Sequence, residues 1–358
     1  MQNLKCKTPV SPSRILHFTF CNLHFAFCIL PLLLLGGCWS ASGPEVVVYT
    51  ALDSEFSEPI FADFTRETGI AVRAKFDTES TKTVGLAEAI LAERQRPRCD
   101  VFWNNEILHT LRLARGGLLE VYRPAAAQSY PAMVRSADGL WHGFAARARV
   151  LLVNTELVPA AQRPGSILDL AAPEWRGRVG LAKPLFGTTA THAACLFAAW
   201  GDDRAGRFFD QLKANQVKIL SGNKQVARSV AGGELAFGLT DTDDAIAEVD
   251  GAMPVAIVYP DQGPEGLGTL FIPNTLAVIK GGPHPAAARQ LIDYLLAPGV
   301  EARLAEGPSA QIPLGPSAGV KLRVETPQTI RAMQVDFAAA AAKWEAAAAV
   351  LRQRFTGG

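Results

Sequence analysis

Short apolar runs and longer segments of helical periodicity alternate along most of this 358-residue chain. Residues 45–50, EVVVYT, have the β-branched composition of a buried strand. In residues 54–69, which follow, Ile60, Phe61 and Phe64 fall on one face of a helix that ends at a glycine. Such an alternation predicts an α/β fold, with a mainly parallel sheet and helices on both of its faces.

The alternation falls into two groups, and the second group begins at the run RVGLAKP. Two extended stretches, residues 147–155 and 268–282, can connect the groups. Two α/β lobes joined by two crossing strands form a clamshell with a hinge. We therefore expect lobe 1 to contain residues 45–149 and 271–358, including Ala-rich C-terminal helices, and lobe 2 to contain residues 150–270.

The first 38 residues have the pattern of an export signal. Three basic residues precede an apolar run that ends in LGGC at residues 35–38, which is the order found in secretory signals. Small residues before a cysteine are typical of a bacterial lipobox; the alternative is an uncleaved anchor, because the run approaches the ~20 apolar residues that span a bilayer. We predict a lipoprotein signal peptide at residues 1–38, lipidation of Cys38, and a periplasmic, membrane-anchored mature chain.

The net charge and the cysteine content limit the classes of protein to which this chain can belong. The net charge of +1 leaves no basic excess for binding nucleic acid. Cys99 and Cys195 are the remaining cysteines after Cys38. Because they fall in different predicted lobes, we expect two separate buried thiols, although an exported protein could in principle pair them.

The sequence gives little support for an enzyme. Residues 239–244, LTDTDD, resemble the D-x-D motif of phosphatases that use an aspartate nucleophile. That motif belongs on the first strand of its domain, with a later lysine and a GDxxxD, whereas the similar WGDD comes earlier here. The sequence has no H-E-x-x-H, P-loop or G-x-G-x-x-G motif. We expect neither an enzyme nor a structural lipoprotein, and no cofactor.

Several stretches resemble the ferric-ion-binding branch of bacterial ABC-importer solute-binding proteins. They are VVVYTALDSEFSEPIFADFTRETGI, CDVFWNNE with ARGGLLEVY, GRVGLAKPLFGTTATHAACLFAAWG and LKANQVKILSGNKQVARSVAGGELAFGLTD, in the family's order between residues 45 and 315. The resemblance implies the two-lobe type II periplasmic-binding fold, with ligand bound between lobes that close about a hinge. It also implies an ABC permease and its ATPase as partners, and we expect a monomer.

The chain departs from this branch at the ligand positions. Where iron-binding members carry two adjacent tyrosines, this sequence has TDTDDA, with Asp241 at its second position. A histidine of many members is replaced by Asp53, and an acidic ligand falls at Asn105, beside Glu106. We therefore expect a polar anionic or phosphorylated small molecule. The alternative is Fe(III) or another metal in an all-carboxylate site formed by Asp53, Glu106 and Asp241, because hard cations accept carboxylate oxygens.

The hydroxyl-rich turns that the family uses for ligand remain. Thr188 and Thr189 open one predicted helix, and Ser80 and Thr81 open another; helix N-termini with free N–H groups bind anions, although ordinary capping is the alternative. We expect Asp241, with Asp243 or Asp244, to accept hydrogen bonds from the solute. Trp103 could stack on ligand or belong to the core. The full set of expected ligand-binding residues is Asp53, Ser80, Thr81, Asn105, Arg147, Gly187, Thr188, Thr189, Asn223, Asp241, Asp243 and Asp244.

Overall fold

The computed structural model describes residues 43–77, 83–316 and 319–355. The predicted signal peptide with Cys38, and the predicted ligand residues Ser80 and Thr81, lie outside the described residues. No helix in the described ranges is long and apolar enough to cross a membrane.

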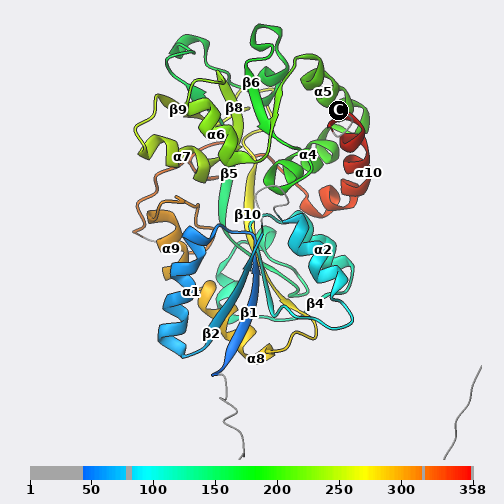
Figure 1. Cartoon of the computed structure of the whole chain (residues 1–358), viewed down its shortest axis with the longest axis vertical. Helices are drawn as coiled ribbons and strands as arrows, with labels where there is room; N and C mark the ends of the chain where they lie inside the picture. Colours follow the sequence, from blue (N-terminus) through cyan, green and yellow to red (C-terminus); the bar gives the residue numbers. More distant parts are fainter. Residues whose placement is uncertain (1–42, 78–82, 317–318, 356–358) are drawn as a thin grey trace, which may run out of the picture. The chain divides into compact units, whose positions relative to one another are not determined.

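Ten strands form one sheet, in the order β2-β1-β3-β10-β5-β8-β6-β7, with β4 beside β10 and β9 beside β5 (Figure 1). The strands are β1 Glu45–Thr50, β2 Ala71–Phe76, β3 Val101–Asn104, β4 Leu119–Glu120, β5 His142–Asn154, β6 Val179–Ala182, β7 Lys218–Leu220, β8 Phe237–Asp241, β9 Val255–Val258 and β10 Phe271–Ile279. Strands β1, β2 and β3 pair in parallel in one half, and β6, β7 and β8 do so in the other. The predicted α/β fold is confirmed.

Helices alternate with the strands of both halves. They are α1 Ser54–Thr68, α2 Val84–Ala92, α3 Leu108–Arg115, α4 Gly187–Trp200, α5 Asp202–Ala214, α6 Asn223–Ala231, α7 Thr242–Asp250, α8 Pro285–Leu295, α9 Pro298–Glu306 and α10 Phe337–Phe355. Short 3-10 helices lie at Ala125–Ser129, Ala132–Val134, Ala160–Gln162, Ile167–Ala171 and Pro173–Trp175. The buried face of α1 contains Ile60, Phe61 and Phe64, as its periodicity predicts.

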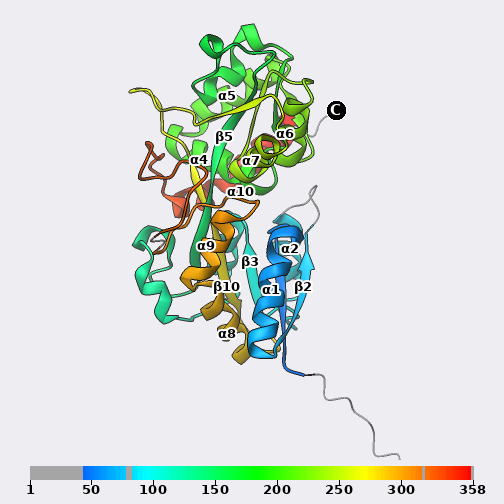
Figure 2. The same cartoon turned by 90° about the vertical axis from the view of Figure 1, so that its left-hand side faces the viewer.

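The long strand β5 connects the two halves, together with β10 (Figure 2). Its first part pairs antiparallel with β10 and its last part with β8 and β9. All thirteen residues of β5 are buried. Because β5 belongs to both halves, charged side chains along it lie where the halves meet. We call the half with β1–β3 lobe 1 and the half with β6–β9 lobe 2.

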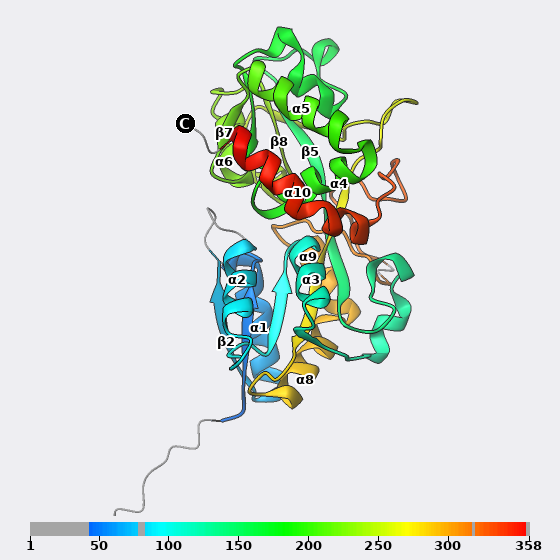
Figure 3. The ribbon, with the colours of Figure 1, turned by 90° about the vertical axis from the view of Figure 1, so that its right-hand side faces the viewer.

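The C-terminal helix α10 differs from the expected lobe boundary. We placed residues 271–358 in lobe 1, but α10 packs mainly on α4 and α5 of lobe 2, and also on α3 of lobe 1 (Figure 3). Its buried Trp344 and Leu351 belong to the same core cluster as Phe197 and Phe209 of lobe 2. The Ala-rich composition predicts a helix, but it does not specify which neighbour that helix packs against.

Burial decides between the alternatives that the sequence leaves open for Trp103 and for the two cysteines. Trp103 has no exposed surface and packs against Phe61 and Phe144, with ring centroids 5.6 and 5.3 Å away, so it is a core residue and does not stack on ligand. Cys99 and Cys195 are separate, buried, free thiols, as expected. Burial raises the pKa of both thiols well above the ordinary value.

Candidate functional site

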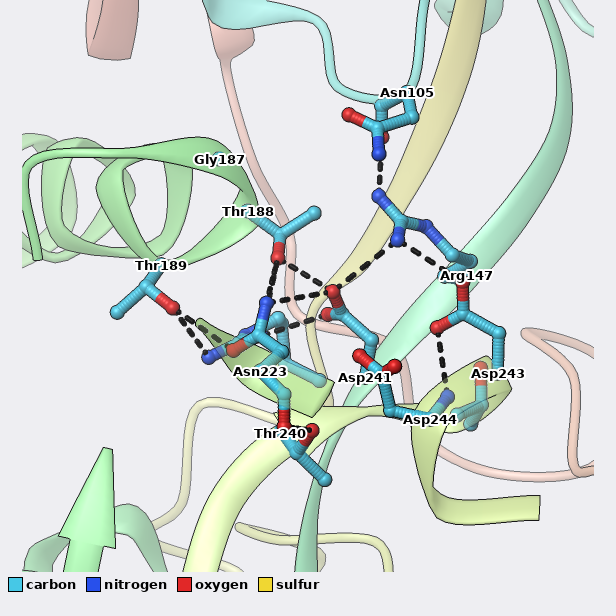
Figure 4. Close-up of polar contacts among 12 residues, drawn as sticks. Asn105, Arg147, Gly187, Thr188, Thr189, Asn223, Thr240, Asp241, Asp243 and Asp244 are labelled. Atoms are coloured by element: carbon cyan, nitrogen blue, oxygen red, sulfur yellow. Dashed lines mark hydrogen bonds and ion pairs between the residues drawn. The ribbon is translucent and has the colours of Figure 1, made fainter. Parts of the chain in front are cut away.

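Three helices of lobe 2 begin at one place. Helices α4, α6 and α7 follow the carboxyl ends of β6, β7 and β8, which are neighbours in the sheet. Thr188 Oγ1 of α4 lies 2.8 Å from Asn223 Nδ2 of α6 and 2.6 Å from Asp241 Oδ2, the residue before α7. Side chains from all three helix starts are therefore within hydrogen-bond distance of one another (Figure 4).

The N-termini of these helices keep backbone donors available. In the described part of the chain, the N-cap residue of each of the three makes no side-chain cap, although Asp243 Oδ1 accepts the N–H of Asp244 in the first turn of α7 at 3.1 Å. Each helix start leaves N–H groups without intrahelical partners and carries the positive end of the helix dipole. Gly187, the first residue of α4, has a φ of 56°, a left-handed value that favours glycine at this turn.

A buried arginine, Arg149, organises this cluster. Its Nη1 lies 2.7 Å from Asp241 Oδ1 and 3.1 Å from both Thr188 Oγ1 and Asn223 Oδ1, and its Nη2 donates to Thr189 Oγ1 at 3.1 Å. Arg149 has no exposed surface. The sequence reasoning missed it, although a signal existed: residues two apart on a strand face the same side, so Arg149 shares the face of the predicted Arg147.

The hydrogen-bond partners of Asp241 are protein groups of the same cluster. Its carboxylate accepts bonds from Arg149, from Thr188 and from Asn223 Nδ2 at 2.9 Å, and it is 1% exposed. Burial would raise the pKa of Asp241, but the nearby Arg149 and Arg147 outweigh burial and hold it below the ordinary value. Asp241 precedes α7 without capping it. In this structure its oxygens are therefore engaged by donors of the cluster.

Arg147 joins this cluster to lobe 1. Its Nη1 lies 3.1 Å from Asp243 Oδ2 and 3.3 Å from Asp241 Oδ2, while its Nη2 donates to the backbone oxygen of Asn105 at 2.5 Å. Burial lowers the pKa of Arg147, but Asp243, Asp241 and Asp244 together raise it above the ordinary value. Arg147, one of the predicted ligand-binding residues, thus forms a buried salt bridge with Asp243 and Asp241.

Glu106 and Asn105 occupy the end of β3 on the lobe 1 side. Glu106 accepts from the backbone N–H groups of Leu108 and His109, which are at the start of α3. It also accepts from Thr191 Oγ1 of α4 at 2.6 Å, so this contact links the two lobes. Among the described residues, the Oδ1 atom of the buried Asn105 has no hydrogen-bond partner. The carboxylate of Glu106 is thus occupied by protein donors.

Carboxylates could hold a metal at one position only in the described part of the chain. Asp241, Asp243 and Asp244 each bring an oxygen within 4.8 Å of the others. The set that we expected as the metal alternative, Asp53 with Glu106 and Asp241, is not such a group among the described residues. Arg147 already lies against two members of the group that does form. A guanidinium in this position competes with a metal ion for the same oxygens.

A cavity of about 440 Å³ opens between the lobes at the start of α1. Lobe 1 contributes residues 51–55 with Phe76 and Asp77, which places the predicted Asp53 on its wall. Lobe 2 contributes residues at the start of α6, and Lys224 Nζ reaches Glu55 Oε1 at 2.9 Å. The volume is within the range of small-molecule sites, which is about 300–1,000 Å³.

His192 takes no part in the candidate site as a charged group. Burial, with Arg149 adding to it, lowers its pKa to about 3. It is therefore neutral at physiological pH. His192 is thus a neutral, buried packing residue beside the cluster.

Residues 110–341, more than half of the chain, match the family model described as "Bacterial extracellular solute-binding protein". Among curated proteins, "Iron uptake protein A1" of Synechocystis is 26% identical over 270 residues, which covers 73% of each chain. The match confirms the predicted resemblance.

Solved structures of this type share the fold. Iron-bound HitA of Pseudomonas aeruginosa has a TM-score of 0.78 at 23% identity, covering 87% of this chain and 99% of that one. The periplasmic binding protein AfuA of Actinobacillus pleuropneumoniae, with exogenous fructose-6-phosphate bound, also has a TM-score of 0.78, at 19% identity, covering 88% of this chain and 99% of that one. At these identities the similarity shows the periplasmic-binding fold alone.

Proposed function

The chain belongs to the family of bacterial extracellular solute-binding proteins, and from this premise we propose that its solute is a small polar molecule with a phosphate or phosphonate group. Members of this family are transport proteins and not enzymes: they bind a solute for an ABC importer. The proposal concerns the solute, its position between the lobes, and the residues that bind it.

The convergence of three helix N-termini supports this proposal most strongly. Thr188 and Asn223, at the starts of α4 and α6, are held in place by Arg149 and Asp241. The backbone N–H groups beside them, together with the helix dipoles, favour a compact anion with several acceptor oxygens. The anionic group of the solute binds there, with Thr189 as a further hydroxyl contact, and the rest of the solute extends into the cavity beside α1.

Iron is the second candidate, because two of the three similar proteins named above bear iron in their names and three carboxylates lie close together. Arg147 and Arg149 weigh against it, since each has a guanidinium nitrogen within 3.3 Å of Asp241. A trivalent cation would meet two fixed positive charges at the oxygens that it needs. We therefore rank a metal ion below an organic anion.

The proposal also includes the attachment of the protein to a membrane and the delivery of its solute to the importer. The protein works in the periplasm, is attached to a membrane through lipidated Cys38, and passes its solute as a monomer to a permease with its ATPase. The motif LGGC at residues 35–38 supports the anchor. Replacing Cys38 with alanine should release the protein or leave its precursor unprocessed. Normal processing with retention in the detergent phase would contradict the anchor.

Native mass spectrometry of protein purified from its own periplasm tests the solute class. We expect a retained organic molecule that contains phosphorus, and its loss on mild unfolding. Calorimetric titration with fructose 6-phosphate and fructose then measures the contribution of the phosphate. A retained metal ion, with no phosphorus, would favour the iron alternative and contradict the proposal.

A further inference from the structure

Strand β5 has one residue more than its partner β10 where the two strands cross between the lobes. Phe144 is opposite Asn274 and Ala146 is opposite Pro273, so Ala145 is an extra residue between two pairs of the ladder. Ala145 therefore forms a β-bulge. Its φ of 41° is a left-handed value, which is unfavourable for a residue with a Cβ atom. A residue in this conformation persists only where its surroundings hold it.

The bulge decides which side chains of β5 share a face of the sheet. On β10, Leu276 and Ile272 are an even number of residues apart, so they lie on the same face. Phe144 of β5 packs in the core cluster of Leu276, in lobe 1. Leu151 of β5 packs in the core cluster of Ile272, in lobe 2. Phe144 and Leu151 are an odd number of residues apart, so only the extra residue between them lets both side chains lie on that face.

Arg147 and Arg149 depend on the bulge for their direction. Arg149 and Arg147 are two and four residues before Leu151, so they lie on its face of the strand. If Phe144 kept its place and the strand had no extra residue, both guanidinium groups would point to the opposite face, away from Asp241. The bulge thus aims the two arginines at the candidate site.

Glu301, on helix α9 of lobe 1, holds the bulge. Its side chain is buried, and its Oε1 accepts the backbone N–H of Ala145 at 2.6 Å. Oε1 also accepts the N–H of Leu314 at 2.9 Å, and Oε2 accepts that of Gly315 at 2.8 Å. The carbonyl oxygen of Ala145 accepts a hydrogen bond from Asn274 Nδ2. Both backbone polar groups of the bulged residue are therefore engaged by side chains.

The same carboxylate holds the segment that pairs with the next residue of β5. Ala146 and Ile312 exchange two backbone hydrogen bonds, of 2.7 and 2.8 Å. Ile312 is two residues before Leu314, which Glu301 also holds. A carboxylate suits three N–H donors because it only accepts hydrogen bonds, whereas an amide would bring a donor of its own.

We propose that Glu301 is a positioning residue for the solute site: it holds the bulge at Ala145 so that Arg147 and Arg149 meet Asp241. The inference deepens the proposed function and rests on it for the nature of the solute. Glu301 acts through β5 and does not contact the solute.

The titration of Asp241, followed by carbon-13 NMR of the aspartate carboxyl groups in the full chain, tests the proposal without any solute. In the wild type, Arg149 and Arg147 hold the pKa of Asp241 below the ordinary value, so its carboxylate should stay ionised down to about pH 4. Glu301→Gln places an amide donor against a backbone N–H, which should release the bulge and draw the arginines away. The effect of burial then dominates, and Asp241 should take up its proton at higher pH than in the wild type.

Asp100→Asn is the matched control. Asp100 is also a fully buried carboxylate of lobe 1, and it accepts the backbone N–H groups of Val47 and His284 at 2.8 and 2.5 Å. Its substitution should lower the melting temperature, as that of Glu301 does, because it removes the same kind of hydrogen bonds. It should leave the titration of Asp241 unchanged.

A second substitution should rescue the first. Ala145→Gly removes the Cβ atom that opposes the positive φ, so the bulge needs less support. The double variant of Glu301→Gln and Ala145→Gly should therefore return the titration of Asp241 toward that of the wild type. Fructose 6-phosphate should bind about tenfold more weakly to Glu301→Gln than to the wild type, and the double variant should regain most of this loss.

The outcomes separate this inference from the proposed function. An unchanged titration of Asp241 in folded Glu301→Gln overturns the positioning role, and so does an equal change in Asp100→Asn. If Glu301→Gln does not fold, Asn274→Ala releases the other side of the bulge and should change the titration in the same direction; no change there overturns the role. If the wild type does not bind fructose 6-phosphate but Asp241 titrates as expected in every variant, the proposed solute is contradicted and the positioning role is supported.

Discussion

The two sides of the interlobe site are built differently. On lobe 2, Arg149, Asp241, Thr188 and Asn223 are buried or nearly so and hold one another by hydrogen bonds of 2.6–3.1 Å. On lobe 1, the cavity wall is partly exposed, and the side chain of Glu55 is 54% exposed. The lobe 2 cluster is preorganised and costs little reorganisation on binding, whereas the lobe 1 wall can vary its charge without disturbing the fold. In the proposed function, the lobe 2 side fixes the anion and the lobe 1 side selects the rest of the solute.

The largest effect is expected from a substitution that breaks the lobe 2 cluster. Asp241→Ala leaves Arg149 buried without its nearest counter-charge. Removing one partner of a buried ion pair lowers the free energy of unfolding by about 3–5 kcal/mol. Urea denaturation measures this loss. Asp244→Ala is the control at a half-buried position of the next helix, and it should cost less than about 1 kcal/mol. Equal effects of the two variants would contradict the contrast between the regions.

The second prediction uses His192, which lies in the same buried region. Its folded pKa of about 3 is below the ordinary value of 6.5. The folded state therefore favours the neutral ring, and the unfolded state binds the extra proton as pH falls below about 6.5. Between pH 6.5 and pH 5 the wild type should lose about 1–2 kcal/mol more stability than His192→Gln. Parallel stability curves for the two proteins would show that burial of His192 does not set its pKa.

Thr191→Val tests the link between the regions. The variant removes the hydroxyl that donates to Glu106 across the lobes at 2.6 Å and keeps the side-chain volume. Loss of one donor to a buried carboxylate should disfavour the closed lobes by about 1–3 kcal/mol. The radius of gyration by X-ray scattering should increase, and solute should dissociate faster. An unchanged radius and dissociation rate would mean that this contact does not stabilise closure.

The smallest effect on stability is expected from a substitution in the lobe 1 wall. Glu55→Gln removes the exposed pair with Lys224. Exposed ion pairs contribute about 0–1 kcal/mol, and salt screens them. Denaturation at low and at high salt should show a loss below about 1 kcal/mol that shrinks as salt increases. A loss comparable to that of Asp241→Ala would remove the distinction between a rigid and a variable side.

The sequence predicted the fold well because alternation and periodicity report burial directly. The strand 45–50 and the apolar face of α1 follow from residue types alone. The packing of α10 on lobe 2 could not be predicted, since its alanines specify a helix and fit many neighbours. Tertiary contacts between distant segments decide such packing.

The sequence predicted most of the residues that gather at the candidate site, but not the hydrogen bonds that they make. Thr188, Thr189 and Asn223 meet as expected, whereas Arg149, on a buried strand far from them in sequence, is not among the predicted residues. The hydrogen bonds of Asp241 could not be predicted, because its partners, on β5 and on α4, are distant in sequence. The role of a buried carboxylate depends on which donors the fold brings to it.

A crystal structure of the protein purified with its own solute tests the central claim most directly. The account predicts a tetrahedral phosphorus group between the lobes, within hydrogen-bond reach of the backbone N–H groups that open α4 and α6, with the pair of Arg149 and Asp241 intact. A metal ion coordinated by Asp241, Asp243 and Asp244, with Arg147 displaced from them, would contradict it.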